Sequence, residues 1–361
     1  MMSGSAKALI IVSFLSATFH VAASARADEN KIGVAAPLSG SFSMLGEQLI
    51  KGAKQAHSNT ASLIIADDSC SAEGGKQAAD IFIKENVSLV TGFLCSEALE
   101  AALPLLQQNH IPVLSSGVQE RTLTEKRKPV SPPVFRLSTG MDKEIAAIGS
   151  ALGSLWKQEA FAVIDDGTIE GRELAAGVLH ALKEQQLEPV FTDTYRPGLD
   201  NQSALVSRLR RAGASHVFVG GQADDAAAIA HSAQSLNYPL IIAGGSLFNA
   251  AAPDIKLSAD TYMVAPLSPD NLKSAQNFKQ DMLAQGEIVE TTLTAGFASL
   301  QIADQAIAQA QAKLVPIAEI LTSTAFETVL GTIHFKQNGM RSDNPNRLHR
   351  FNGQSFAPVE N

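Results

Sequence analysis

The chain has 361 residues, of which 45% are hydrophobic and 18% are charged, and its formal net charge is −8. This length can build one large or two medium-sized cores, since domains usually run about 100–200 residues. Lysine and arginine are dispersed, and the sequence has no basic stripe or arginine-rich arm that could neutralise phosphates. These properties argue against a nucleic-acid-binding protein.

The first residues have the order that is typical of a secretory signal peptide. Lys7 precedes a short apolar run, Ala8–Leu15, and small residues follow at Ala22–Ala27 in an A-x-A pattern. A membrane span would need about 20 apolar residues, and this stretch is interrupted by Ser13, Ser16, Thr18 and His20. We expect residues 1–27 to be cleaved off after Ala27 or Ala25. No Cys lies at the cleavage region and no later segment is apolar enough to span a bilayer, so the expected mature protein is exported, soluble and without a lipid anchor.

Cys70 and Cys95 are the only two cysteines, and they lie about 25 residues apart. In an exported chain a lone pair of this kind predicts a disulfide, which would stabilise the fold by about 3 kcal/mol in the chain-entropy model. Two separate buried thiols are the alternative. A metal site is disfavoured, because neither cysteine belongs to a C-x-x-C pair and no histidine lies close in sequence.

Short apolar runs alternate with amphipathic helical patterns in the first part of the mature chain. The runs predict strands at Lys31–Pro37, Leu63–Ala66, Leu89–Gly92 and Pro112–Ser115, and the patterns predict helices at Gly46–His57, Gly75–Glu85 and Glu97–Asn109. This alternation indicates βαβ units on a parallel sheet that is covered on both faces.

The alternation restarts after the proline-rich and basic stretch Lys126–Pro133. Strands are predicted at Val134–Leu137, Phe161–Ile164, Val190–Tyr195, His216–Gly220 and Leu240–Ala243, and helices at Lys143–Trp156, Gly171–Lys183, Ser203–Arg211 and Asp224–Leu236. Gly213 is expected to end the Ser203–Arg211 helix. Two consecutive sets of similar size indicate two similar α/β lobes.

The composition changes again beyond Tyr262. We expect helices at Asn271–Gln285, Thr294–Gln311 and near Ile317–Thr322, then an edge hairpin at Val329–Phe335 and a last strand at Leu348–Phe351. These elements follow two complete sets of strands.

Several segments occur in an order that is typical of one known family. They are Ile32–Gly40 with Gly46, Asp67–Cys70 followed by Gly92–Ser96, Val134–Arg136, and Val217–Gly221. On these segments the chain, from about Lys31 to Phe351, resembles the periplasmic leucine/isoleucine/valine-binding family of bacterial ABC importers. The resemblance also implies the Cys70–Cys95 disulfide.

The resemblance implies a type I periplasmic binding protein fold: two doubly wound parallel-sheet lobes joined by three hinge crossings. The crossings would fall near Ser138–Met141, Pro266–Leu267 and Phe335–Gly339. Lobe one would contain residues 28–139 and 267–336, and lobe two residues 140–266 and 337–361. Closure of the lobes around a ligand creates a shape that a membrane permease can distinguish. We therefore expect a periplasmic monomer whose partners are a small-molecule ligand and an inner-membrane ABC permease.

Ser96 is the first candidate ligand contact. In open α/β sheets ligands bind beyond the carboxyl ends of the strands, and Ser96 follows such an end. We expect it to cap the next helix, whose free N–H groups and positive dipole end suit an anion. The resemblance places a ligand carboxylate at the matching position. The alternative is that Ser96 only caps its own helix.

Other family contacts correspond to residues that differ from the family pattern. The carbonyl, hydroxyl and carboxylate that hold a ligand ammonium match Gly117, Gln119 and Gly245 here, and walls that are aromatic in the family match Leu45, Glu170 and Gln222. Gly245 has no carboxylate. Either Glu170 or Asp166 replaces it, or the ligand lacks an ammonium and Gln119 and Gln222 contact its hydroxyls or amides. Both outcomes predict a pocket more polar than an aliphatic side chain needs.

We therefore expect a component of an ABC importer that binds amino acids or related small polar carboxylates or amides, without a cofactor, a metal or catalysis. The alternative is a ligand-sensing module that delivers its closed state to a receptor or cell-wall enzyme. Ser154–Lys157 fits S-x-x-K and Ser342–Asn344 spells S-D-N, but no K-T-G follows. The histidines are dispersed without paired spacing, so the sequence offers no partnered nucleophile or base.

Overall fold

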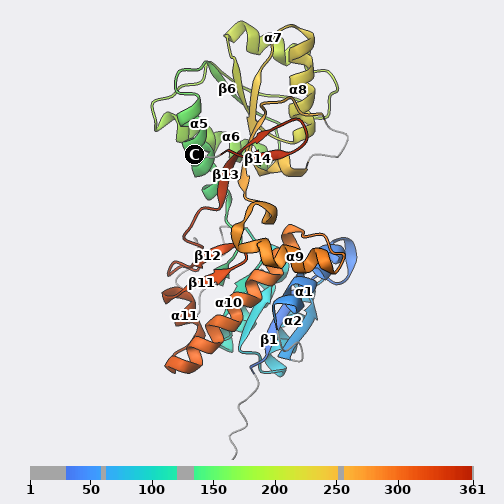
Figure 1. Ribbon diagram of the computed structural model, residues 1–361, viewed down its shortest axis with the longest axis vertical. Coiled ribbons are helices and arrows are strands. Elements are labelled where there is room, and N and C mark those ends of the chain that lie inside the picture. The colour runs from blue at the N-terminus through green and yellow to red at the C-terminus, as the bar shows by residue number, and fades with distance from the viewer. Residues whose placement is uncertain (1–29, 58–61, 120–133, 251–255, 360–361) are drawn as a thin grey trace, which may run out of the picture.

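Figure 1 shows a computed structural model of the chain, which describes residues 30–57, 62–119, 134–250 and 256–359. The predicted signal peptide and the Lys126–Pro133 stretch lie outside the described residues. The chain forms two α/β lobes that meet at a narrow waist, which confirms the predicted fold class. Within the described ranges, no helix is both long enough and apolar enough to cross a membrane.

Lobe one is built on five parallel strands in the spatial order β2-β1-β3-β4-β5. They are β1 (Ile32–Ala36), β2 (Leu63–Asp67), β3 (Leu89–Gly92), β4 (Val113–Ser115) and β5 (Val134–Arg136). In β1 every residue is buried: Ile32, Val34 and Ala36 belong to the core on one face of the sheet, and Ala35 to the core on the other. A continuous apolar run is what a strand covered on both faces needs, because successive side chains point to opposite faces.

Helices cover both faces of this sheet. α2 (Ala72–Lys84) and α3 (Ser96–Gln108) pack on one face, and α1 (Ser43–Ala56), α10 (Thr291–Lys313) and α11 (Ile317–Ser323) on the other. α1 and α10 are far apart in sequence but lie side by side. A Cβ added to Gly52 would lie 1.9 Å from the carbonyl oxygen of Leu293, and one added to Gly296 would lie 2.1 Å from that of Leu49. Only glycine at both positions allows this approach of the two helices.

Lobe two is built on seven strands in the order β14-β13-β10-β9-β8-β6-β7. They are β6 (Phe161–Asp165), β7 (Phe191–Thr194), β8 (His216–Gly220), β9 (Ile241–Gly244), β10 (Tyr262–Pro266), β13 (Asn346–Phe351) and β14 (Phe356–Pro358). β13 runs antiparallel to both of its neighbours, β10 and β14, and all other neighbouring strands are parallel. α5 (Met141–Leu155) and α6 (Ile169–Lys183) cover one face, and α7 (Ser203–Ala212) and α8 (Ala223–Ser235) the other. Gly213 ends α7 in the left-handed conformation, as predicted.

The last part of the chain differs from the sequence prediction in several elements. Strand β10 was not predicted, and β14 follows the strand predicted to be the last because Phe356 packs on Phe351, with ring centroids 5.3 Å apart. The helix expected at Asn271–Gln285 is only α9 (Gln276–Ala284), preceded by the 3-10 turns η4 (Pro269–Asn271) and η5 (Lys273–Ala275). Extended Leu272 separates those turns and packs on the lobe-one core. The predicted hairpin begins earlier, with β11 (Ala325–Thr328) and β12 (Gly331–His334).

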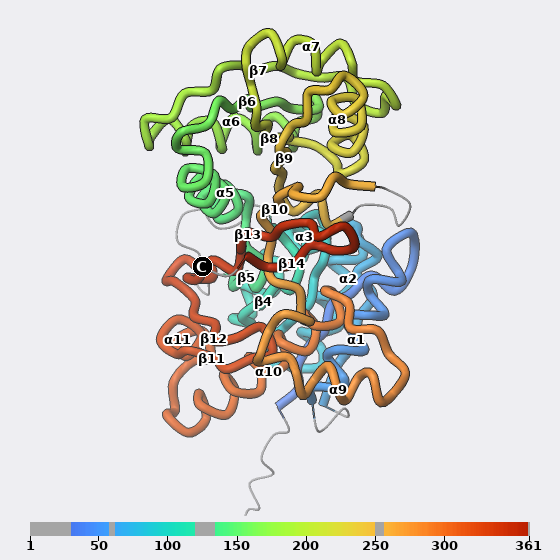
Figure 2. Tube along the Cα trace, turned by 45° about the horizontal axis from the view of Figure 1, so that its top comes forward, coloured from blue at the N-terminus to red at the C-terminus, as the bar shows by residue number. Residues whose placement is uncertain are grey.

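The chain passes between the lobes three times (Figures 1 and 2). It leaves lobe one after β5, returns after β10, and leaves again before β13. At the third passage, Met340 forms a β-bridge with Arg136, and the N–H of Arg136 donates to the carbonyl of Gly339 at 3.0 Å. The chain up to Met340 therefore lies along β5. The division into folding units at 139/140, 266/267 and 336/337 stays a prediction.

Candidate ligand-binding cleft

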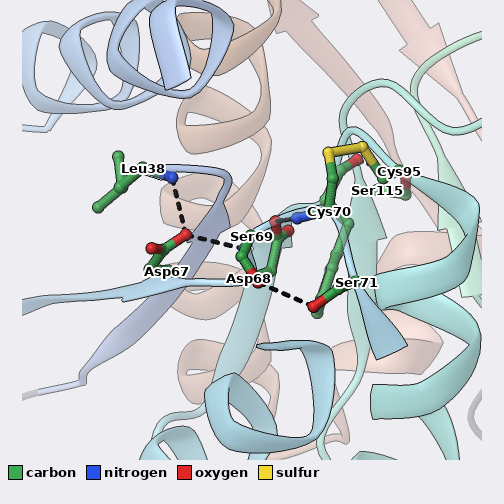
Figure 3. Close-up of a disulfide and its surroundings, with 9 residues drawn as sticks. Leu38, Asp67, Asp68, Ser69, Cys70, Ser71, Cys95 and Ser115 are labelled. Atoms are coloured by element: carbon green, nitrogen blue, oxygen red, sulfur yellow. Dashed lines mark hydrogen bonds between the residues drawn. A yellow bond between two sulfur atoms is a disulfide. The ribbon is translucent and has the colours of Figure 1, made fainter. Parts of the chain in front are cut away.

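The carboxyl ends of β1, β2 and β3 are tied together around a disulfide (Figure 3). Cys70, after β2, is bonded to Cys95, after β3, with Cα atoms 5.2 Å apart, which confirms the predicted pair. Asp67 accepts the backbone N–H groups of Leu38 and Ser69, each at 2.8 Å. This edge of the lobe-one sheet is therefore held by a covalent bond and by hydrogen bonds between strand ends.

Asp68 is a buried carboxyl within this frame. Its Oδ1 accepts the N–H of Cys70 at 3.0 Å, and its Oδ2 has no hydrogen-bond partner among the described residues. Burial raises the pKa of Asp68 to about 6, and the charge of Asp67 adds to this rise while the Cys70 N–H opposes it. For Asp67, burial acts in the same direction, but N–H donors including Leu38 and Ser69 outweigh it and lower the pKa. Neighbouring aspartates thus have opposite pKa shifts.

Ser96 is the first residue of α3 and is half-buried. The residue that caps the helix is Cys95, which makes no side-chain capping hydrogen bond, so the expectation that Ser96 is the cap was wrong by one position. The cap position is occupied by a cysteine because the disulfide requires it there. This helix end therefore keeps N–H groups without a side-chain cap, beside the Ser96 hydroxyl.

Gly117 and Gln119 follow β4 in lobe one. A Cβ on Gly117 would lie 2.7 Å from Cδ2 of Leu94, so the position accepts only glycine without a shift of that side chain. The carbonyl of Gln119 accepts a hydrogen bond from the Arg136 guanidinium at 2.9 Å, and Gln119 itself is exposed. Its amide is therefore at the surface of the lobe.

The acidic candidates of lobe two have different surroundings. Asp166 accepts the backbone N–H of Thr168 at 2.9 Å and its hydroxyl at 2.6 Å, so its Oδ1 is engaged within its own turn. Glu170 is exposed in the first turn of α6, and Gln222 is the exposed N-cap of α8, without a side-chain capping bond. Of the two carboxylates proposed to replace the missing one, Glu170 is the less engaged.

The space beside Gly245 is occupied by a carboxylate that the sequence did not reveal. A Cβ on Gly245 would lie 2.4 Å from Oε1 of Glu144, in the first turn of α5. The same oxygen accepts the N–H of Ser246 at 2.6 Å. Burial raises the pKa of Glu144, the Ser246 hydrogen bonds lower it, and the charge of Glu170 raises it. Glu144 was missed because it lies 101 positions from Gly245 (245 − 144), and only the fold brings them together.

A cavity of about 340 Å³ lies where the lobes join. Residues from both lobes and from all three passages line it, among them Ser116, Gln119, Glu144, Ser246, Asn249 and Arg341. Of the six predicted ligand residues, Gln119 is part of this lining, whereas Ser96, Gly117, Leu45, Glu170 and Gln222 are not. The structure therefore brings Glu144 and Gln119 to one cavity and leaves the other predicted residues outside its wall.

Apolar side chains are exposed just after β1. Leu38, Phe42, Met44 and Leu45 are exposed by 37%, 50%, 70% and 40%. Only Leu45 was predicted from the sequence as a ligand contact. The other three could have been found in the same way, because they also closely follow the carboxyl end of β1. They form an apolar rim on lobe one.

A Ser-His-Asp arrangement lies in lobe one, before the start of β2. His57 Nδ1 is 2.9 Å from Asp304 Oδ1, and its Nε2 is 2.5 Å from Ser62 Oγ. Ser62 is only 4% exposed, and it precedes β2, at the opposite end of the strand from the disulfide. The Ser62 hydroxyl and both ring nitrogens of His57 are already engaged with one another and with Asp304, so we assign these bonds to holding α1, β2 and α10 together. Within the described ranges, no three His, Cys, Asp or Glu residues could hold a metal ion.

Two α/β lobes, three passages and a cavity between them define a two-lobed binding protein. The family model described as "Periplasmic binding protein" matches residues 29–354, and the chain belongs to this family. The chain is 26% identical to "Leu/Ile/Val-binding protein homolog 2" of Brucella abortus (strain 2308) over 331 residues, covering 87% of this chain and 88% of that one.

Solved structures share the fold at low sequence identity. An ABC-type branched-chain amino acid transporter from Rhodopseudomonas palustris CGA009 is similar with a TM-score of 0.74 and 15% identity, covering 91% of this chain and 95% of that one. A solute-binding protein of an ABC transporter from R. palustris, in complex with benzoate, has a TM-score of 0.63 and 16% identity, with 91% and 95% covered. At such identities the likeness concerns the fold.

Proposed function

We propose that the chain is the periplasmic substrate-binding component of an ABC importer, and that it captures its ligand without chemical change. The observation that carries this proposal is the cavity to which both lobes and all three passages contribute. A small rotation about three short passages opens or closes such a cavity around a ligand. The closed monomer would then dock on an inner-membrane ABC permease, after cleavage of the signal peptide near Ala27.

The proposed ligand is an amino acid or a related small polar carboxylate or amide. The name of the Brucella relative points to amino acids, and the benzoate complex concerns a carboxylate without an ammonium. We assign the ligand carboxylate to Ser96 and the uncapped start of α3. Gly117 and Gln119 of lobe one, Glu170 and Gln222 of lobe two, and Leu45 at the apolar rim complete the proposed contact set.

A thermal-shift screen of the mature chain, residues 28–361, tests this function. The panel contains amino acids, their amides and small carboxylates, because a ligand that binds only the folded state stabilises it by about 2.7 kcal/mol at a hundredfold excess over Kd. We expect at least one α-carboxylate to raise Tm in a concentration-dependent manner. The matched control is its methyl ester, which lacks the carboxylate and should give a smaller shift. A panel without any shift would contradict the proposal.

A further inference from the structure

Glu144 is a carboxylate at the cavity wall without a countercharge. It lies beside Gly245 in lobe two, and Ser246 donates to it through its backbone and its hydroxyl. No ion pair of Glu144 is present among the described residues. A carboxylate has about four acceptor sites, so the two Ser246 contacts leave capacity for another donor.

The other charged groups at this cavity are already engaged. Arg341 binds Asp343 through two hydrogen bonds, Nε to Oδ1 at 2.6 Å and NH2 to Oδ2 at 2.7 Å. Arg347 donates to the carbonyl groups of Asn344 and Asn346. Among the charged side chains of this wall, Glu144 is therefore the one that a ligand cation can bind without breaking an ion pair.

Ser116 of lobe one gives a second, independent sign of a ligand. It lines the same cavity, is 2% exposed, and its Oγ has no hydrogen-bond partner among the described residues. A buried hydroxyl without a partner costs free energy that a ligand group can recover. The carbonyl of Ser116 accepts from Ser138 Oγ at 2.9 Å and its N–H donates to Gly92 at 2.6 Å, so the hydroxyl is carried on a fixed backbone.

We propose that Glu144 is the lobe-two contact that selects ligands carrying a protonated amine, and that Ser116 contributes a hydrogen bond from lobe one to the same ligand. This proposal rests on the proposed function and specifies its ligand class. An ammonium left unpaired in a closed cavity is costly, and Glu144 supplies the anion. A cation bound beside Glu144 favours the ionised carboxylate, and so opposes the burial and the repulsion by Glu170 that raise its pKa.

Isothermal titration of the mature chain with matched ligand pairs tests the proposal. Each pair consists of an amino acid that raises Tm and the carboxylic acid with hydrogen in place of its ammonium. We expect Glu144→Gln to weaken the amino acid roughly 10- to 100-fold and the deaminated acid by less than about twofold. Ser116→Ala should weaken the amino acid roughly threefold to tenfold. Glu173→Gln, which removes an exposed acid of α6 outside the proposed contact set, is the control and should change Kd by less than about threefold.

The outcomes separate this inference from the proposed function. If the wild-type chain binds neither member of any pair, the proposed function fails. If it binds the deaminated acid as tightly as the amino acid, or if Glu144→Gln weakens both members equally, the assignment of Glu144 is wrong and the binding function stands.

A second test moves the carboxylate from position 144 to position 245, where the family has its own carboxylate. Gly245→Glu alone should fold poorly or lose binding, since its Cβ would lie 2.4 Å from Glu144 Oε1. With Glu144→Ala in the same chain, the nearest remaining obstacle is Cδ2 of Leu174 at 2.9 Å, the end of a flexible side chain. The double variant should recover preference for the amine over Glu144→Ala alone. A double variant that melts like wild type but ignores the amine would count against the proposal.

Discussion

The two sides of the cleft are held in place by different chemistry. On lobe one, the Cys70–Cys95 disulfide and the bonds of Asp67 join the ends of three neighbouring strands. On lobe two, hydrogen bonds of Asp166 stay within a single turn, and Tyr195 reaches Asp225 at 3.3 Å. Lobe one thus presents an apolar rim and an uncapped helix start, and lobe two presents acids. In the proposed binding mode, which assigns the ligand carboxylate to Ser96 and the ammonium to Glu144, a ligand with a negative and a positive end has one favourable orientation.

The largest expected effect comes from removing the disulfide. Cys70→Ser with Cys95→Ser should lower the free energy of unfolding by about 3 kcal/mol, since the bond closes a loop of 25 residues. Urea unfolding would measure the loss of unfolding free energy, and amide hydrogen exchange of the folded variant would show which strands are destabilised. Exchange should rise at β1, β2 and β3 and stay unchanged at β6 and β8. If amide exchange became faster to the same extent in both lobes, the disulfide would not stabilise lobe one specifically.

The neighbouring aspartates should respond to pH with opposite signs. The pKa of Asp68, about 6 in the fold, lies above its unfolded value of about 3.9. Its stabilising contribution is therefore present below about pH 4 and lost as pH rises through about 6. Asp68→Asn should exceed wild type in unfolding free energy by about 1–2 kcal/mol at pH 8, and this difference should fall as the pH drops from about 6 to about 4. Urea titrations at several pH values measure this difference.

Asp67→Asn is the matched control for that series. The lowered pKa of Asp67 means that its contribution is present above the unfolded value of about 3.9 and lost as pH falls through the folded one. This variant should therefore be less stable than wild type at pH 8, by up to about 1 kcal/mol, and approach it in acid. Variants that change stability with the same sign at pH 8 would contradict the assigned shifts.

The smallest effects are expected from removing one hydroxyl at the start of a helix in each lobe. Thr168 caps α6 by accepting the N–H of Gly171 at 3.0 Å, whereas Ser96 makes no cap. Thr168→Ala should cost about 1 kcal/mol of stability and leave Kd unchanged. Ser96→Ala should leave Tm within about 1 °C and weaken a carboxylate ligand roughly tenfold. Unchanged affinity after Ser96→Ala would remove the carboxylate from the start of α3.

The sequence predicted most of the fold, because a buried parallel strand is recognisable from a short continuous run of apolar residues. Apolar runs such as Leu89–Gly92 and His216–Gly220 coincide with β3 and β8 to the residue, and the cysteine pair needed no geometry to predict. The later elements were less predictable. β10 was missed although turn-type residues flank it, because only Met263–Ala265 of this strand are buried. The start of α9 depends on a tertiary contact of Leu272, which the local pattern does not indicate.

The cleft was less predictable than the fold. Matching to a family pattern compares single positions. At Gly245 this comparison shows only that the family's carboxylate is missing. The side chain that fills its place comes from α5, and nothing local to Gly245 indicates it. Likewise, the missing hydrogen bond of Ser116 is a property of its surroundings and not of its position in the chain.

The packing of α10 against α1 has a consequence for the order of folding. The core of lobe one that contains Leu49, Ile50 and Ala53 is completed by residues of α10 such as Leu300, Ile302 and Ala303. Most of lobe two lies between these two segments. As the chain is synthesised from its N-terminus, the apolar face of α1 stays uncovered until the last quarter has been made. Contacts at such separation form slowly, so the lobe that is begun first cannot be completed until most of the other lobe has been synthesised.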